Sequence, residues 1–236
     1  RAICAGPGNP PVVVDETADI DKAAVSIIQG AAFDNNILCI GEKEVYAVRS
    51  IAGELKRCLL QNGCVELDRA QTDALAKEVF VVDDKGEWAA CRNYVGRSPQ
   101  VLAEAIGLTV PADTQLLIGE VDHDHPFVQH EQMMPFVPLV QTQDVLTAID
   151  MAIEAEHGYY HTAVMHSKNV ENMTVMARKC RCAIFVKNGP SSAGLGAGGE
   201  GYTSFSIATP TGEGCTSART FTRQRRCALV DYFRIV

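Results

Sequence analysis

The sequence has no long apolar run and no excess of basic side chains. It carries 21 Lys and Arg residues against 29 Asp and Glu residues, which gives a net charge of -8 at pH 7. Because no extended basic stripe offsets this charge, nucleic acid and anionic membrane surfaces are not expected as partners. No segment approaches the length of a membrane span and nothing near Arg1 resembles a signal peptide, so we expect a soluble, cytoplasmic protein.

The cysteines also lack any repeated spacing. There are 9 of them, an odd number, so a disulfide framework is not expected and reduced thiols fit better. Cys180 and Cys182 do not form a metal knuckle, because paired zinc ligands usually have at least two residues between them. The chain is nevertheless 47% hydrophobic over 236 residues, which is ample for a sizeable core.

What is present is a regular alternation of apolar strand patterns and amphipathic helix patterns. We predict strands at 11–14, 45–48, 116–121, 136–140, 162–165 and 183–186, and helices at 19–33, 51–61, 145–157 and 170–179. Thr17 or Asp19 is placed to cap the first helix. This order predicts an α/β fold with a mostly parallel sheet covered by helices, whose functional residues lie in loops at strand ends.

Three segments depart from this alternation. Residues 68–110 are more polar and are predicted to be a largely helical insertion over one edge of the sheet. Residues 189–201 are too rich in glycine for regular structure and predict a loop that lines a pocket. Their glycines match a dinucleotide-binding fingerprint in letters, but no helical pattern follows, so phosphate binding is disfavoured. Residues 226–236 form an apolar strand pattern, and an unpaired strand there predicts a contact between subunits.

Cys39 is the strongest candidate for chemistry. It falls in the connection between a predicted helix and a predicted strand, where a thiol held by two packed elements can meet a substrate. A buried structural cysteine is the alternative, because cysteine often packs as a small apolar side chain. A thiol of ordinary pKa, about 8.5, is roughly one-tenth thiolate near pH 7.5, so a nucleophile here would need only modest activation.

Histidines and acidic residues offer further candidates. His123 and His125, with Glu131 nearby, supply ligand types for a metal, but no second cluster completes the set and the segment predicts a surface turn. His161 and His166 flank a predicted strand. Each could orient a substrate or satisfy hydrogen bonds within the core, and the structural role is the commoner one.

Several motifs occur together in a fixed order along the chain. They are Gly8-Asn9-Pro10-Pro11, residues 36–39, Glu131-Gln132-Met133-Met134-Pro135, residues 161–167, residues 185–190 and residues 209–219. As an ordered set they closely resemble the C-terminal half of the CoA-acylating aldehyde dehydrogenases of propanediol and ethanolamine utilisation, within the aldehyde dehydrogenase superfamily. The resemblance covers the whole chain.

The resemblance implies that Cys39 is the nucleophile of an oxidation. It would attack acetaldehyde or propionaldehyde, give a thiohemiacetal that passes hydride to NAD, and become a thioester whose acyl group is taken by coenzyme A. The backbone N–H of Cys39 is suited to donate to the oxyanion, and the family's second donor is an asparagine of the other half. The resemblance also assigns Glu131 to the acid that contacts the nicotinamide ribose, with Met133 where an aromatic residue usually follows.

One departure from the hydrolytic members of the superfamily bears on the reaction type. Those enzymes carry the motif Glu-Leu-Gly-Gly-Lys-x-Pro, whose glutamate activates the water that hydrolyses the thioester. Counting back from Gly8 places Ala5 at the position of that glutamate. Without a carboxylate there, water is a poor competitor and a thiol acceptor is favoured.

The resemblance further implies an organisation in three parts. Residues 1–8 would end the last strand of an NAD-binding domain that this chain lacks, residues 9–206 would form the catalytic domain, and residues 207–236 would form a return segment with the oligomerisation strand. We therefore expect a fragment that is inactive or nearly so alone, and a parent enzyme that is a homo-oligomer. The family often works in the lumen of bacterial microcompartments, with shell association through a segment outside this chain.

Two other classes of function stay open at this point. The chain could be a stand-alone, non-catalytic α/β module for binding or assembly that uses its C-terminal strand. It could also be a metal-dependent hydrolase built on His123, His125 and Glu131. The sequence does not separate acetaldehyde from propionaldehyde, because one methylene in a pocket is worth only about 1 to 3 kcal/mol.

Overall fold

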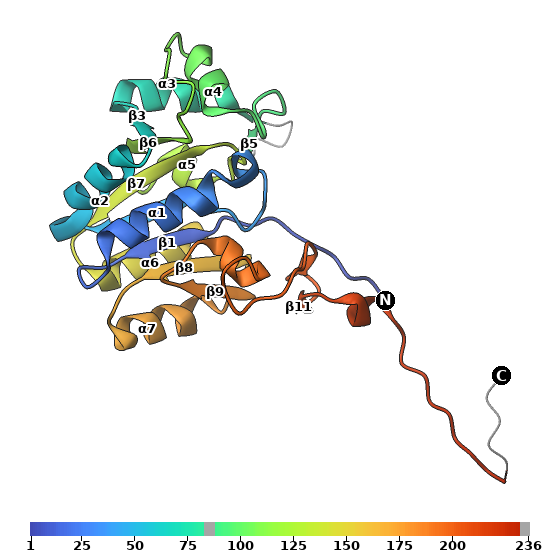
Figure 1. Cartoon of the computed structure of the whole chain (residues 1–236). Helices are drawn as coiled ribbons and strands as arrows, with labels where there is room; N and C mark the ends of the chain where they lie inside the picture. Colours follow the sequence, from blue (N-terminus) through green and yellow to red (C-terminus); the bar gives the residue numbers. More distant parts are fainter. Residues whose placement is uncertain (83–87, 232–236) are drawn as a thin grey trace.

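A seven-stranded parallel sheet forms the centre of the molecule (Figure 1). The computed structural model describes residues 1–82 and 88–231. The strand order is β3-β6-β7-β2-β1-β8-β9, and every pair of neighbours is parallel. The strands are β1 (Pro11–Val14), β2 (Glu44–Val48), β3 (Cys64–Glu66), β6 (Leu116–Glu120), β7 (Phe136–Thr142), β8 (Thr162–His166) and β9 (Ile184–Lys187). The predicted α/β class with a mostly parallel sheet is confirmed.

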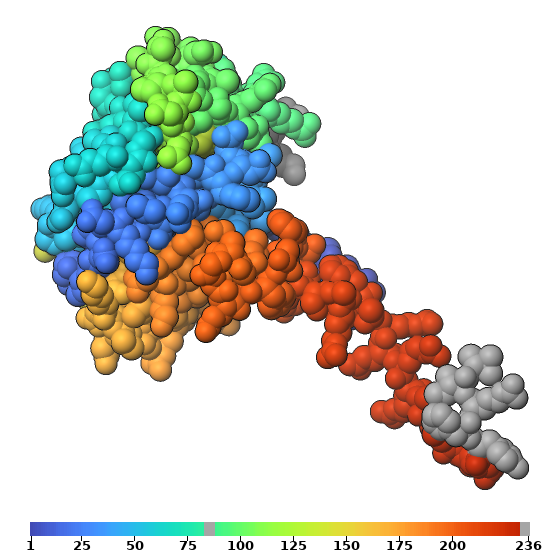
Figure 2. Space-filling view, in the orientation of Figure 1, coloured from blue at the N-terminus to red at the C-terminus, as the bar shows by residue number. Residues whose placement is uncertain are grey.

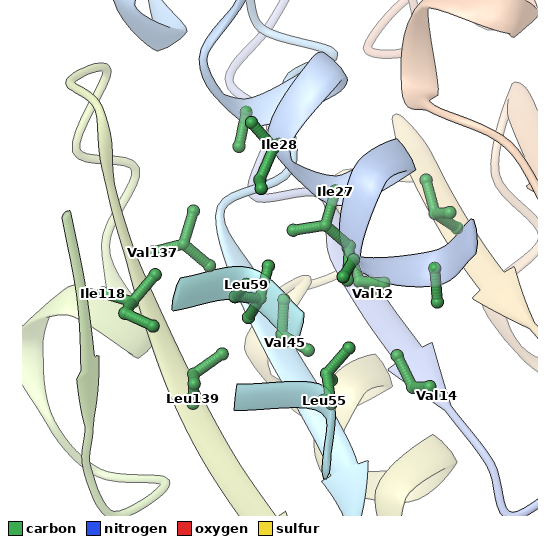
Figure 3. Packing of buried hydrophobic residues seen from close by; sticks show 14 of the residues in the cluster. Val12, Val14, Ile27, Ile28, Val45, Leu55, Leu59, Ile118, Val137 and Leu139 are labelled. Carbon is green, nitrogen blue, oxygen red and sulfur yellow. The ribbon is translucent and has the colours of Figure 1, made fainter. Parts of the chain in front are cut away.

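Successive residues of a strand point to opposite faces of the sheet, so apolar strands leave both faces to be buried, and helices cover both. In β1, Val12 and Val14 join the core under α1 and α2, whereas Val13 joins the core under α6 and α7. Figure 3 shows the first of these cores, in which Ile27 from α1 and Leu59 from α2 lie over the strands. The four helices are α1 (Ile20–Ala31), α2 (Arg49–Gln61), α6 (Val145–Ala155) and α7 (Val170–Cys180).

The first helix begins at one of the two capping residues that the sequence predicts. The Asp19 side chain accepts a hydrogen bond from the Lys22 N–H at 3.2 Å, so Asp19 is the cap. Thr17 instead donates its hydroxyl to Asp15 at 2.6 Å and stays in the preceding turn.

A third core lies at the β3 edge of the sheet. It contains Leu75, Leu102, Phe127 and Phe136, and it packs between the sheet and the short elements outside it. These elements are α3 (Arg69–Val79), β4 (Phe80–Val82), β5 (Trp88–Ala90), α4 (Pro99–Ala105) and α5 (Pro126–Gln129). The insertion predicted at 68–110 is thus two helices and an antiparallel strand pair. Within the described ranges, no helix is long and apolar enough to cross a membrane.

The glycine-rich segment, residues 189–201, forms mostly turns after a short 3-10 helix, η2 (Ser191–Leu195). It lines a cavity against β9, where Ile184 and Val186 form the opposite wall. Beyond it, β10 (Ile207–Ala208) and β11 (Gly214–Cys215) form a small antiparallel pair.

Both ends of the chain project from this body (Figure 1). Residues 1–10 contain no strand, so the strand ending predicted at 1–8 does not form in this structure. The Cys4 N–H instead donates to the Thr211 hydroxyl at 3.1 Å. The assignment of residues 1–8 to a neighbouring domain stays a prediction.

The C-terminal segment is an extended arm, residues 222–231, which Figure 2 shows as a narrow projection in red. Residues 226–231, the described part of the strand predicted at 226–236, form no strand within this chain, because no other strand of the described chain lies beside them. A strand that forms by pairing with another subunit stays a prediction. Residues 232–236 lie outside the described residues.

Leu59→Ala is expected to lower the free energy of unfolding by roughly 2 to 5 kcal/mol, because Leu59 is fully buried and truncation leaves a cavity. Leu60→Ala, one position along the same helix, is the matched control. Leu60 is 38% exposed, so its replacement should cost less than about 1 kcal/mol. Urea unfolding followed by circular dichroism measures both losses, and equal losses would contradict the assignment of the buried face.

Candidate active site

The candidate site lies at the amino-terminal ends of four neighbouring strands, β7, β2, β1 and β8. The loops that enter these strands carry, in that order, Glu131, Cys39, Gly8 and His161. A Cβ at Gly8 would lie 3.0 Å from both the Cys39 carbonyl oxygen and the His161 ring, so glycine allows the close approach of these loops. The structure thus places Cys39 and Glu131, the two predicted site residues, in one region.

Residues 33–43, which we call the Cys39 loop, leave α1 through a 3-10 turn (η1, Phe33–Asn36). Asp34, Asn35 and Asn36 have positive φ angles of 48°, 51° and 60°. Asp and Asn tolerate this left-handed conformation better than other residues with a Cβ. The Asp-Asn-Asn run is therefore the local signal that turns the chain toward β2.

Lys43 holds the Cys39 loop from within the core. Its side chain is fully buried, and Nζ donates to the carbonyl oxygens of Asn36 at 3.0 Å and Leu38 at 3.3 Å, and also to the Asn36 side chain. Burial lowers the pKa of Lys43 to about 8, although the negative charges of Glu131 and of an ionised Cys39 oppose this shift. All three acceptors belong to Asn36 and Leu38, which lie just before Cys39 in the chain. The ammonium group therefore fixes the path of the backbone that presents the thiol.

The thiol of Cys39 is half-buried, and opposing influences act on it. Burial raises its pKa, and the charge of Glu131 raises it further. Lys43 and hydrogen bonds from the backbone N–H groups of Cys39 and Ile40 lower it, and the net direction is upward. Formation of the thiolate at Cys39 therefore relies on Lys43 and on the backbone N–H groups, which oppose the effect of burial.

Two carboxyl groups near Lys43 have oxygen atoms without partners. Burial raises the pKa of Glu131, while Lys43 and the Gly8 N–H lower it. Its Oε1 is buried and has no hydrogen-bond partner among the described residues. Both oxygens of Glu44 are also unpartnered within that part of the chain, and burial raises its pKa well above the usual range. Glu131 therefore presents a free acceptor atom beside the thiol.

Glu42 joins the Cys39 loop to the glycine-rich segment. Its two oxygens accept hydrogen bonds from the Ser191 N–H at 2.7 Å and the Ser191 hydroxyl at 2.8 Å. A Cβ at Gly30 would lie only 2.0 Å from Glu42 Oε2, so the glycine in α1 makes room for this carboxyl group. Burial raises the pKa of Glu42 to about 7, although the bonds from Ser191 oppose the shift.

His161 is buried at the entry to β8. Its backbone N–H donates to Glu156 at 2.9 Å, and its ring Nδ1 lies 2.9 Å from the Thr162 hydroxyl. Burial, with a smaller contribution from Lys43, lowers the pKa of His161 to about 4, so the ring is neutral near pH 7. His166 lies at the opposite end of the same strand, and the structure does not bring it to the site.

The candidate metal ligands are engaged in other contacts. The His123 ring lies 3.0 Å from the Tyr46 hydroxyl, and His125 caps α5 by accepting from the Phe127 N–H at 3.2 Å. In the described ranges, no three His, Cys, Asp or Glu side chains are grouped so as to hold a metal ion. The hypothesis of a metal-dependent hydrolase gains no support from this arrangement.

Sequence reasoning missed Lys43 and Glu42. A signal was available, because three charged residues, Glu42, Lys43 and Glu44, directly precede an apolar strand. Such residues are usually solvated in a turn, yet all three are buried here. A run of charged residues that leads into a central strand thus indicates a buried polar network in this protein.

The chain is similar in sequence to a known family and to characterised proteins. A model described as the aldehyde dehydrogenase family matches residues 1–214. The acetaldehyde dehydrogenase (acetylating) EutE of Salmonella typhimurium is 52% identical over 237 residues, which cover 100% of this chain and 51% of that protein. The chain spans about half the length of the curated relatives it matches.

Two solved structures are similar over nearly the whole chain. The propionaldehyde dehydrogenase of Rhodopseudomonas palustris, with bound CoA and an acylated cysteine, has a TM-score of 0.91 at 50% identity, covering 97% of this chain and 52% of that chain. A propionaldehyde dehydrogenase from the Clostridium phytofermentans fucose utilisation bacterial microcompartment has a TM-score of 0.91 at 45% identity, covering 99% and 53% respectively.

Two substitutions should move the pKa of Cys39 in opposite directions. Lys43→Met removes the cation that favours the thiolate, so the pKa of Cys39 should rise further. Glu131→Gln removes an opposing negative charge, so the pKa should fall. The measurement is the pH dependence of the rate at which iodoacetamide alkylates Cys39, followed by peptide mass spectrometry.

Lys56→Met is the control for this experiment, because Lys56 pairs with Glu66 and Glu120, each at 2.8 Å, away from the site. Its pH midpoint for alkylation of Cys39 should match that of the unmodified protein. If Lys43→Met fails to fold, the downward shift in Glu131→Gln still tests the arrangement. Coincident pH profiles for Glu131→Gln and the unmodified protein would contradict it.

Titration of Glu42 should make the protein less stable as the pH rises. The folded state, with a pKa of about 7, holds a proton that the unfolded chain has lost above a pKa of about 4.3, so the free energy of unfolding falls between these values. Glu42→Gln keeps hydrogen-bonding groups for Ser191 and abolishes the titration. Between pH 5 and pH 8, the free energy of unfolding of Glu42→Gln should fall by roughly 2 to 3 kcal/mol less than that of the unmodified protein.

Urea unfolding at each pH measures this difference. Glu54→Gln is the matched control, since Glu54 is exposed on α2. It should retain the full decline. Equal declines in Glu42→Gln and in the unmodified protein would show that Glu42 does not hold a proton in the folded state.

Proposed function

The chain belongs to the aldehyde dehydrogenase family, and on this basis we propose that it carries the catalytic cysteine of a CoA-acylating aldehyde dehydrogenase. The enzyme oxidises acetaldehyde or propionaldehyde to the acyl-CoA with NAD and coenzyme A. One observation carries the proposal: Cys39 lies on a loop fixed by a buried cation, near Glu131 and His161. Similarity to an acetylating dehydrogenase and to a CoA-bound propionaldehyde dehydrogenase supports it.

The first step is attack of the Cys39 sulfur on the carbonyl carbon of the aldehyde. The thiol loses its proton, a carbon–sulfur bond forms, and negative charge develops on the carbonyl oxygen. The N–H groups of Cys39 and Ile40 are the local donors for that oxygen, and Lys43 favours the thiolate over the thiol. The product is the oxyanion of a thiohemiacetal on Cys39, from which loss of hydride alone gives a thioester.

When bound, NAD would supply the acceptor for the hydride that leaves the thiohemiacetal oxyanion. The residues of this chain fit one contact with NAD, because Glu131 offers a buried and unpartnered oxygen, Oε1, that can accept a hydrogen bond from a ribose hydroxyl. Hydride loss leaves a thioester on Cys39. The other contacts to NAD are expected in a nucleotide-binding half of the parent enzyme.

The thiol of coenzyme A then takes the acyl group from Cys39. His161 is placed to accept the thiol proton, because its ring lies against the Gly8 position beside the Cys39 loop and is neutral near pH 7. Burial lowers its pKa to about 4, so it is a weak base in this structure. Ala5 stands where hydrolytic relatives carry the glutamate that activates water, which favours transfer to a thiol over hydrolysis.

We also propose that the parent enzyme is a homo-oligomer assembled through its C-terminal segment. Leu229 and Val230 are exposed on the extended arm and offer an edge to a neighbouring sheet. A location inside a bacterial microcompartment is supported by the origin of one similar structure. Shell association would use a segment outside this chain.

The test uses the full-length enzyme, with short-chain aldehyde, NAD and coenzyme A. Acyl-CoA should form together with NADH, and Cys39→Ser should abolish both. Ala5→Glu should divert part of the product to the carboxylic acid, because it places a carboxylate where water can be activated. Liquid chromatography with mass spectrometry measures the ratio of acid to acyl-CoA.

Ala5→Gln is the matched control, because it has nearly the same size without the negative charge. It should leave the product ratio unchanged. Acyl-CoA formation that survives Cys39→Ser would overturn the catalytic assignment and favour the alternative of a binding or assembly module. An unchanged ratio in Ala5→Glu would overturn the role given to Ala5 alone.

A further inference from the structure

Two thiols outside the candidate active site lie close together. Cys180 is the last residue of α7, and Cys182 stands two positions later, before β9. Their sulfur atoms are 3.3 Å apart. Arg181, between them, has a left-handed conformation with φ of 49° and ends the helix.

The backbone at this turn suits a bond between the two sulfurs. Helical geometry of either hand at a middle residue places the flanking Cα atoms about 5.4 Å apart. Disulfides span Cα separations of about 4.4 to 6.8 Å, with a sulfur–sulfur bond of about 2.05 Å. The Cα separation is therefore within the usual range for a disulfide, and the bond requires the sulfurs to approach from 3.3 Å to about 2.05 Å.

The surroundings also favour reaction of this pair. A hydrogen bond from the Cys182 thiol lowers the pKa of Cys180, although burial opposes this. Cys180 is buried but Cys182 is half-buried, which leaves a side of the pair open to a small reagent. The Cys182 thiol also lies 3.0 Å from the Ile184 carbonyl oxygen, so its direction is fixed next to Cys180.

We propose that Cys180 and Cys182 form a reversible intramolecular disulfide by exchange with a small disulfide such as oxidised glutathione. The thiolate of one cysteine attacks a glutathione sulfur and releases one glutathione thiolate. The second cysteine then attacks the first in the mixed disulfide and releases the other. The two thiols lose two electrons and two protons, and one oxidised glutathione becomes two reduced molecules.

The pair lies one strand away from the candidate active site and does not include Cys39. The Ala183 N–H donates to the Tyr160 carbonyl at 2.8 Å, and the Ile184 N–H donates to the His161 carbonyl at 3.1 Å. Oxidation removes the one thiol hydrogen of Cys182, for which the Cys180 sulfur and the Ile184 carbonyl oxygen are the two neighbouring acceptors. The disulfide would thus modify the segment before β9, whose backbone is hydrogen-bonded to residues 160–161 at the entry to β8.

The test exploits the position of Arg181. The protein is equilibrated in mixtures of oxidised and reduced glutathione, free thiols are blocked with iodoacetamide, and the chain is digested with trypsin, which cuts after Arg181. The disulfide should join the dipeptide Cys180-Arg181 to residues 182–187 as one species that separates on reduction. If trypsin spares the bond inside the ring, the peptide 180–187 should be two hydrogen atoms lighter and unalkylated.

Three variants complete the experiment. Cys180→Ser and Cys182→Ser should each lose the linked species, whereas Cys215→Ser should retain it. Cys215 is the matched control because its sulfur lies 3.8 Å from the Ala183 carbonyl, in the same neighbourhood. Two outcomes would overturn the proposal: alkylation of both cysteines, or separate glutathione adducts on them, at every ratio; or a disulfide from either cysteine to Cys215.

Discussion

One buried positive charge, the ammonium group of Lys43, organises the candidate site. Removing such an ion from water costs several kcal/mol unless the protein supplies replacement partners. Oxygens of Asn36 and Leu38 do so directly, and buried carboxyl groups supply opposing charge. Lys43 and the Cys39 loop depend on each other, because the hydrogen bonds that stabilise the buried ammonium group also define the path of the loop. The position of the thiol therefore follows from the solvation of a neighbouring residue.

The main sheet and its helices could be predicted from the sequence because each pattern is reinforced by burial. The buried residues Val12, Val13 and Val14 give β1 apolar side chains on both faces of the sheet, as a central parallel strand requires. β3 was missed because it has three residues, of which only Cys64 is buried. The antiparallel pair β4 and β5 is equally short. Residues 226–231 have no neighbouring strand in the described chain, and the strand predicted from residue 226 onward needs one from another subunit.

Cys39 could be found from its place between elements, and Glu131 from its motif. Glu42 and Lys43 were missed although the charged run 42–44 was visible, because the run by itself does not show burial, which depends on distant residues. Gly30 leaves space for Glu42, and Ser191, far along the chain, satisfies its oxygens. The upward shift of the Cys39 pKa could not be predicted either, because desolvation arises from packing that a local pattern does not contain.

The location of the site has an electrostatic consequence. In a parallel α/β sheet each connecting helix runs antiparallel to its strands, so helix C-termini gather at the amino edge, where the macrodipole carries about half a negative charge. Bound anions and reactive thiolates commonly use the positive N-terminal ends instead. Cys39 stands at the amino edge, after the C-terminus of α1. The field of the fold opposes its ionisation, and the positive charge that helices do not provide there must come from a side chain.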